Sequence, residues 1–122
     1  MKILIVDDSV SMRQMISIIL TGAGHEVTEA VDGSDGLHKL NEEIDAVVTD
    51  YNMPNMGGIE FIRNVRGGTV NKKVPILMLT TESEASKKTE GREAGATAWI
   101  TKPFNRESLL TTLDKITRSV SF

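Results

Sequence analysis

Short, almost uninterrupted apolar runs alternate along this chain with segments of helical periodicity, and this alternation restricts the possible folds more than any other feature. Four runs dominate and a fifth is weaker: residues 2–6, 45–49, 74–79 and 96–100, with 26–30. Runs such as Ile-Leu-Ile-Val lack the polar alternation of a half-exposed strand. They therefore predict strands that are buried on both faces of a parallel sheet.

The segments between these runs have apolar residues at helical spacing. Ser9 and Asn105 are expected to cap the first and the last helix, and Gly22 and Gly24 to close the first. The expected inward-facing residues are, in chain order, Met12, Met15, Ile16, Ile19, Leu20, Leu37, Leu40, Ile59, Phe61, Ile62, Val65, Leu109, Leu110, Leu113 and Ile116. Five rounds of strand and helix predict one α/β domain over 1–122. Its open, doubly wound sheet should carry helices on both faces, since a barrel of eight units would need about twice the chain.

The fourth expected helix, 84–93, fits this pattern least well. Its apolar contacts are limited to Ala85 and the more distant Ala94, and Gly91 costs about 0.8–1 kcal/mol relative to alanine. Two interpretations stay open: a plain exposed helix, or a mobile element of a switch.

Composition excludes several classes of protein. The absence of cysteine removes disulfides, thiolate metal sites and cysteine nucleophiles, and it fits a reducing compartment. No apolar run approaches the roughly 18 residues of a membrane span, so we expect a cytoplasmic protein without membrane insertion. The net charge of −3 gives no basic footprint for nucleic acid. Residues 51–122 carry +4 against −7 for residues 1–50, which indicates either a basic partner surface or a solvated face.

The ends of the expected strands carry the candidate chemistry. In open α/β sheets, ligands bind beyond the carboxyl ends of the strands, and there this chain places Asp7, Asp8, Asp50, Thr80 and Lys102. Three close carboxylates need a shared cation, and an all-oxygen ligand set that works with phosphate favours Mg²⁺. Lys102 and the Thr80 hydroxyl can then bind phosphoryl oxygens, and Asp50 can act as a nucleophile that forms an acyl phosphate.

These motifs resemble the receiver domain of response regulators. The matching segments are ILIVDDS at 3–9, DYNMPNMGG at 50–58, LTTE at 79–82 and AGATAWITKPF at 94–104, in family order across the whole chain. The chain is most similar to single-domain chemotaxis regulators of the CheY type, whose flavodoxin-like sheet has the strand order 2-1-3-4-5. The resemblance implies a two-component phosphorelay protein without an effector domain. It also implies a protein that is no enzyme beyond its own phosphoryl transfer and autodephosphorylation.

The resemblance assigns roles to the site residues. Asp50 would accept the phosphoryl group from a histidine kinase. Asp8 would bind the metal directly and Asp7 through water, with the backbone carbonyl of Asn52 as a further ligand. Lys102 matches the lysine of the family, and a cis peptide before the following proline would aim it into the pocket.

A second group of residues matches the family's switch. Thr80 corresponds to the hydroxyl that moves onto the phosphoryl oxygens, and Trp99 stands where the family has an aromatic switch, usually Tyr or Phe. A tryptophan simply buried at the sheet edge is the alternative. Asn52 and Glu82 occupy positions that tune the lifetime of the acyl phosphate. Gly57 replaces a common aspartate, which should affect only the loop and the start of the next helix.

The expected output surface consists of helix 84–94, strand 96–100 and helix 105–118. The resemblance implies three partners: a histidine kinase, the flagellar motor switch protein and a phosphatase. It also implies that this protein is a monomer. A phosphate sink or a non-motor regulator is the alternative output. A phosphohydrolase of the haloacid-dehalogenase type would need a D-x-D motif where this chain has Asp50-Tyr51-Asn52. A flavin or nucleotide carrier would need a glycine-rich phosphate loop, and none follows any expected strand.

Overall fold

Five parallel strands form a single sheet in the order β2-β1-β3-β4-β5 within the residues that the computed structural model describes, 1–81 and 85–118. The strands are β1 Lys2–Val6, β2 Glu26–Ala30, β3 Ala46–Asp50, β4 Ile76–Thr80 and β5 Ala98–Thr101. The helices between and after them are α1 Val10–Gly22, α2 Gly33–Lys39, α3 Gly58–Gly67, α4 Ala85–Ala94 and α5 Arg106–Arg118. The predicted doubly wound α/β fold and its strand order are confirmed.

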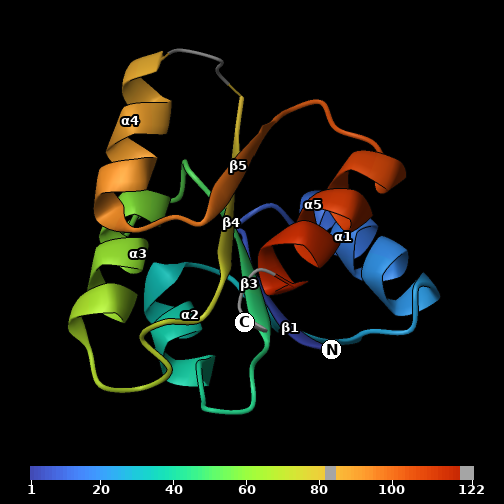
Figure 1. The fold of residues 1–122 in the computed structure, drawn as a ribbon, viewed down its shortest axis with the longest axis horizontal. Coiled ribbons are helices and arrows are strands. Elements are labelled where there is room, and N and C mark those ends of the chain that lie inside the picture. The colour runs from blue at the N-terminus through green and yellow to red at the C-terminus, as the bar shows by residue number, and fades with distance from the viewer. Residues whose placement is uncertain (82–84, 119–122) are drawn as a thin grey trace.

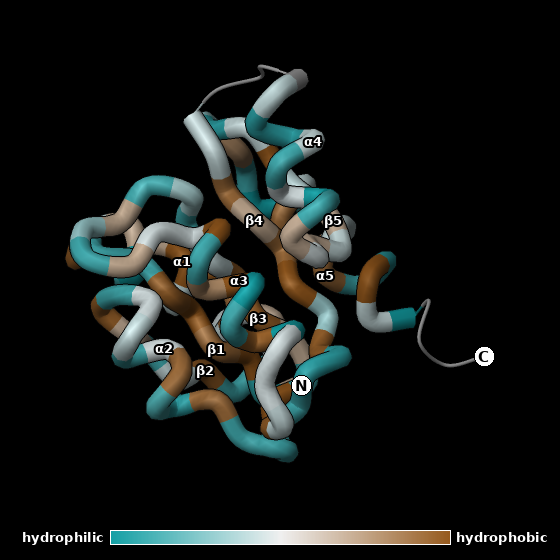
Figure 2. The backbone as a smooth tube through the Cα atoms, turned by 90° about the vertical axis from the view of Figure 1, so that its left-hand side faces the viewer, coloured by the Kyte–Doolittle hydropathy of each residue, from teal (hydrophilic) through white to brown (hydrophobic). Residues whose placement is uncertain are grey.

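The sheet lies between two layers of helices, with α2, α3 and α4 on one face and α1 and α5 on the other (Figure 1). Because successive side chains of a strand point to opposite faces, Leu4 and Val6 pack under α2 and α3, whereas Ile3 and Ile5 pack against α1 and α5. The tube through the central strands is accordingly coloured mostly brown, which marks hydrophobic residues (Figure 2). No helix in the described part of the chain is both long and apolar enough to cross a membrane.

The predicted helix caps are confirmed at both ends of the chain. The hydroxyl of Ser9 accepts a hydrogen bond from the Met12 amide at 3.2 Å, and Oδ1 of Asn105 accepts one from the Ser108 amide at 2.8 Å. Strands β3, β4 and β5 begin one or two residues later than their apolar runs. At β4 the reason is that hydropathy reports burial: Val74 and Pro75, just before the strand, are both buried.

Helix α4 is continuous through Gly91, although glycine was expected to weaken it. Gly91 is buried, and an added Cβ at this position would lie 2.6 Å from the terminal methyl carbon of Met78. The missing side chain therefore lets the helix approach β4 closely. The rest of α4 is mostly polar, as its teal and white colouring shows (Figure 2).

Candidate functional site

The carboxyl ends of the parallel strands bring the predicted site residues to one edge of the sheet. Asp50 is the last residue of β3 and Thr80 the last of β4, and Thr80 pairs in register with Thr101 of β5. Asp7 follows β1 directly, and its amide donates to the carbonyl oxygen of Ala30 at 3.1 Å, which extends the pairing with β2 by one residue. Parallel topology alone thus places residues from distant parts of the sequence side by side.

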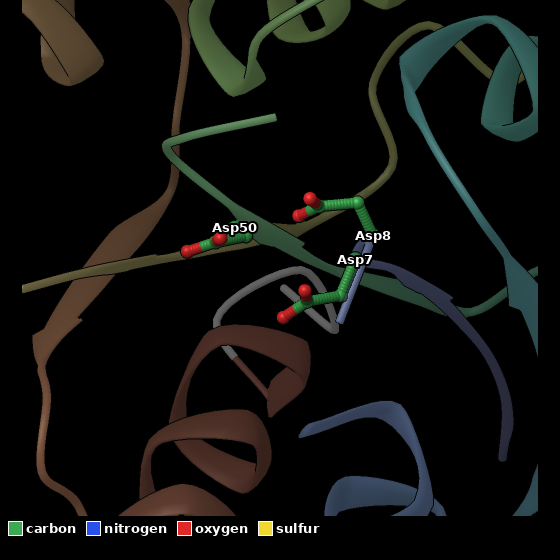
Figure 3. A group of neighbouring side chains, drawn as sticks. All are labelled: Asp7, Asp8 and Asp50. Atoms are coloured by element: carbon green, nitrogen blue, oxygen red, sulfur yellow. The ribbon is translucent and has the colours of Figure 1, made fainter. Parts of the chain in front are cut away.

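Asp7, Asp8 and Asp50 form an acidic cluster. A carboxylate oxygen from each lies within 4.8 Å of those of the other two. The three side chains project to the same side from the ends of β1 and β3 (Figure 3). Asp8 is exposed, but Asp7 and Asp50 are only 1% and 7% exposed. Two of the three negative charges are therefore held away from bulk water.

The Asp7 carboxylate has one satisfied and one unsatisfied oxygen. Its Oδ1 accepts a hydrogen bond from the Ser9 amide at 2.8 Å, whereas its Oδ2 is buried and has no hydrogen-bond partner among the described residues. Burial raises the pKa of Asp7 above its ordinary value; the Ser9 amide opposes this shift, and the charge of Asp50 adds to it. A buried anionic oxygen that lacks a donor, on a carboxylate beside two others, is what a hard divalent cation would compensate, so these residues fit Mg²⁺.

Lys102 supplies the positive charge of this edge. Its ammonium nitrogen lies 2.8 Å from Oδ1 of Asp50, and its backbone amide donates to the carbonyl oxygen of Thr80 at 2.7 Å. The peptide bond between Lys102 and Pro103 is cis, as predicted. The ends of β3, β4 and β5 are thus connected through a single residue.

The remaining predicted residues lie around this centre. Thr80 is fully buried, and Asn52 is exposed in the loop after β3. Glu82 falls outside the described residues. Gly57 caps α3 without a side-chain hydrogen bond, which is the local effect expected of it. The tuning and switching roles assigned to these residues stay predictions.

Gly58 is a residue that sequence reasoning missed. Its amide donates to the carbonyl oxygen of Tyr51 at 2.9 Å, and an added Cβ would overlap the carbonyl oxygen of Asp50. Only a glycine allows the first turn of α3 to lie this close to the end of β3. The Gly57-Gly58 pair after the loop was the available signal, but the sequence does not say which of the two glycines makes the close contact.

Trp99 and Tyr51 flank helix α4 on two sides. Trp99 is partly buried on the edge strand β5, with Lys88 and Arg92 of α4 over its ring at 5.9 and 5.5 Å from the centroid. Trp99 is therefore neither enclosed in the sheet edge nor free of α4.

Tyr51, the neighbour of Asp50, was not singled out from the sequence. Its hydroxyl donates to Oε2 of Glu90 at 3.1 Å, and Nζ of Lys87 lies 4.9 Å from its ring centroid. Helix α4 is polar and has few apolar contacts. Two aromatic rings contact it through cation–π interactions with its basic side chains.

Comparison with known proteins identifies the family. The model of the response regulator receiver domain matches residues 3–114. The chain belongs to the response regulator receiver domain family. This receiver domain is 42% identical to chemotaxis protein CheY-3 of Vibrio cholerae over 118 residues, which cover 95% of this chain and 91% of that protein.

Solved structures agree with this assignment. The structure of chemotaxis protein CheY4 of Vibrio cholerae superposes with a TM-score of 0.89 at 50% identity, covering 94% of this chain and 97% of that one. The receiver domain of a sensor histidine kinase of Pseudomonas aeruginosa, solved with a magnesium ion coordinated in its active site cleft, matches with a TM-score of 0.88 at 26% identity. That match covers 96% of this receiver domain and 97% of the kinase's.

Proposed function

We propose that this receiver domain is a phosphorylation-activated switch of a two-component system, which takes a phosphoryl group from a histidine kinase onto Asp50. One observation carries the proposal: an oxygen of a nearly buried Asp50 carboxylate lies 2.8 Å from the Lys102 ammonium, beside two further carboxylates. A purely structural ion pair would not need the two extra acids, which repel Asp50 and each other.

The proposed reaction is a transfer between two residues. A carboxylate oxygen of Asp50 attacks the phosphorus of a phosphohistidine; the new P–O bond forms as the P–N bond breaks, and the leaving imidazole takes up a proton from solvent. Hydrolysis follows when water attacks the same phosphorus, which breaks the P–O bond and releases inorganic phosphate. Because Lys102 already contacts Asp50, it is placed to bind the incoming phosphoryl oxygens.

The acidic cluster would hold Mg²⁺ through the side chains of Asp7, Asp8 and Asp50, with the Asn52 carbonyl as a further ligand. When bound, the ion would neutralise charge on the transferring phosphoryl group. The chain's own residues do the rest: Asp50 is the nucleophile, and Lys102 would bind the phosphoryl oxygens. Asn52 has no carboxyl group to act as general acid or base, which argues against a phosphohydrolase and for a protein that acts only on its own phosphoryl group.

The signal would leave the site through Thr80, Trp99 and α4. Phosphorylation adds about −1.5 to −2 charges next to Lys102, whose backbone is hydrogen-bonded to Thr80. A shift at the end of β4 reaches Trp99 on the neighbouring strand, and through its cation contacts reaches Lys88 and Arg92. The face formed by α4, β5 and α5 would then bind the target.

Chemotaxis is the proposed context, because chemotaxis proteins are among the relatives that this chain matches over nearly the whole length of both partners. The flagellar motor switch protein would be the target and a histidine kinase the donor, with a phosphatase shortening the signal. A phosphate sink or a non-motor output would use the same chemistry at Asp50 and differ only in what the α4–β5–α5 face binds.

The test is phosphorylation with a small-molecule donor. Wild type with Mg²⁺ and acetyl phosphate should gain the mass of one phosphoryl group and change its Trp99 fluorescence, and Asp50→Asn should do neither. A wild type that gains no mass at Asp50 would overturn the proposal. A pulldown with a motor switch peptide, with and without beryllofluoride, then separates the motor output from the alternatives.

A further inference from the structure

We propose that Arg13 is a positioning residue for the acidic cluster: braced by Glu29, its guanidinium fixes the backbone of Asp7 so that the free carboxylate oxygen of Asp7 faces the cation site. The inference deepens the proposed function and rests on it, because it concerns the Mg²⁺ that the cluster would hold. It assigns a task to a residue that lies outside the cluster itself.

The contacts of Arg13 join three elements. Its Nη1 donates to the carbonyl oxygen of Asp7 at 2.6 Å, and its Nε donates to Oε1 of Glu29, on β2, at 3.3 Å. The Arg13 side chain is only 12% exposed, whereas that of Glu29 is 42% exposed. The Arg13 guanidinium is therefore more shielded from water than the Glu29 carboxylate, and a largely desolvated guanidinium is kept in place only by good partners.

The position of Arg13 in its helix makes these contacts informative. A cation near the N-terminus of a helix is disfavoured by the helix dipole, and the first turn of α1 contains no acidic residue to offset it. Helical side chains lean toward the N-terminus, which directs Arg13 back over the loop that follows β1. The local sequence thus disfavours a cation at this position, and the tertiary contacts with Asp7 and Glu29 account for it.

With this contact, Asp7 is held at three points. Its amide donates to Ala30, its carbonyl accepts from Arg13, and its Oδ1 accepts from the amide of Ser9. The oxygen that remains is Oδ2, which is buried and finds no hydrogen-bond partner in the part of the chain that the structure describes. Groups that orient metal ligands from behind in this way commonly change metal affinity by about 10–100-fold when they are removed.

Charge and positioning predict opposite effects of removing Arg13. If the guanidinium acted only as a positive charge near three carboxylates, its loss would remove a repulsion and a divalent cation would bind more tightly. If it positions Asp7, its loss frees the loop and the cation binds more weakly. The sign of the change in affinity therefore distinguishes the two roles.

The experiment titrates the full chain with Mn²⁺, counting free ion by electron paramagnetic resonance, and then displaces it with Mg²⁺. Arg13→Gln should bind both ions about tenfold more weakly than wild type. In the metal-free variant the Ser9 amide should exchange with solvent faster, because its acceptor on Asp7 is no longer fixed. Arg118→Gln, which removes the same charge from an exposed pair with Asp114, is the matched control and should bind as wild type does.

Glu29→Ala keeps the inference testable if Arg13→Gln does not fold. Glu29 is half-exposed, and its substitution removes only the carboxylate that accepts the hydrogen bond from Arg13. It should weaken binding in the same direction, by a smaller factor. Affinity that is unchanged or tighter in the folded variants, with wild type binding normally, would overturn the role of Arg13 and leave the proposed function intact. A wild type that binds neither ion would instead count against the proposed function.

Discussion

The ammonium nitrogen of Lys102 lies 2.8 Å from Oδ1 of Asp50, in a pair whose side chains are 16% and 10% exposed. The two residues are 52 positions apart, and the contact joins the edge of the sheet after β5 to the end of β3. The same edge holds Asp7 and Asp8, so one ammonium faces three carboxylates. Lys102 thus lowers the negative charge of the cluster without cancelling it.

Lys102→Gln should change metal binding and phosphorylation in opposite directions. Loss of the ammonium leaves three carboxylates without their counter-charge, so Mg²⁺ should bind more tightly. Phosphorylation by acetyl phosphate should slow by about 10²-fold, because the ammonium that would bind the phosphoryl oxygens beside Mg²⁺ is lost. Calorimetric Mg²⁺ titration and mass-detected phosphorylation measure the two effects. Lys2→Gln is the control, with the same charge change in exposed pairs with Glu26 and Glu43, and equal effects in both variants would contradict the assignment.

Asp7→Asn should stabilise the metal-free protein. The substitution removes a buried negative charge that has an unsatisfied oxygen and lies close to Asp50, and it should raise the free energy of unfolding by about 1–2 kcal/mol. Excess Mg²⁺ should narrow the difference in free energy of unfolding between the variant and wild type, because the ion binds and stabilises folded wild type. Urea unfolding with and without Mg²⁺ measures both. Asp8→Asn, at an exposed position, should have a smaller effect, and a metal-free Asp7→Asn that unfolds more easily than wild type would refute this account of the site.

Two adjacent glycines should respond differently to alanine. At Gly58 an added Cβ would overlap the backbone of Asp50, which cannot move without displacing β3, so Gly58→Ala should cost about 2–3 kcal/mol. At Gly57 the nearest atom, the Tyr51 carbonyl oxygen, is 3.5 Å from the added Cβ, and Gly57→Ala should cost about 1 kcal/mol or less. Thermal unfolding of the pair measures the difference. Similar midpoints for both variants would show that α3 does not depend on this close approach.

Tyr51→Phe should loosen helix α4. The variant keeps the ring under Lys87 but removes the hydrogen bond to Glu90, which is worth about 1 kcal/mol in a helix with few apolar contacts. Amide hydrogen exchange within α4 should then become about fivefold faster. The amides of α1, on the opposite face of the sheet, serve as the internal control. Unchanged exchange in α4 would mean that Tyr51 does not help to hold this helix.

Much of the fold could be predicted from local signals. Apolar runs mark strands because both faces of a parallel strand are buried, and capping residues such as Ser9 and Asn105 mark helix ends because they satisfy free amides. The site residues could be predicted as well, since parallel strands bring their carboxyl ends to one edge. Strand boundaries were less accurate: at β4 the apolar run begins with Val74 and Pro75, which are buried before the strand starts.

The contacts that position Asp7 and helix α4 depend on tertiary packing. Arg13 reaches Glu29 across 16 residues and Tyr51 reaches Glu90 across 39. Neither pair has a local signature, because each side chain taken alone is typical of a solvated surface. Gly91 is a further case, since as an isolated helical residue it should weaken α4, yet in the fold it makes room for Met78.

By itself, the sequence determined the alternation of strands and helices, the doubly wound topology and the acids that gather at the sheet edge, because periodicity, capping and strand polarity act over short distances along the chain. Only the tertiary structure decided that Oδ2 of Asp7 lacks a hydrogen-bond partner within residues 1–81 and 85–118, that Lys102 pairs with Asp50, and that aromatic rings contact α4. Those properties depend on which atoms become neighbours when water is excluded, and a linear pattern of residue types does not specify such contacts.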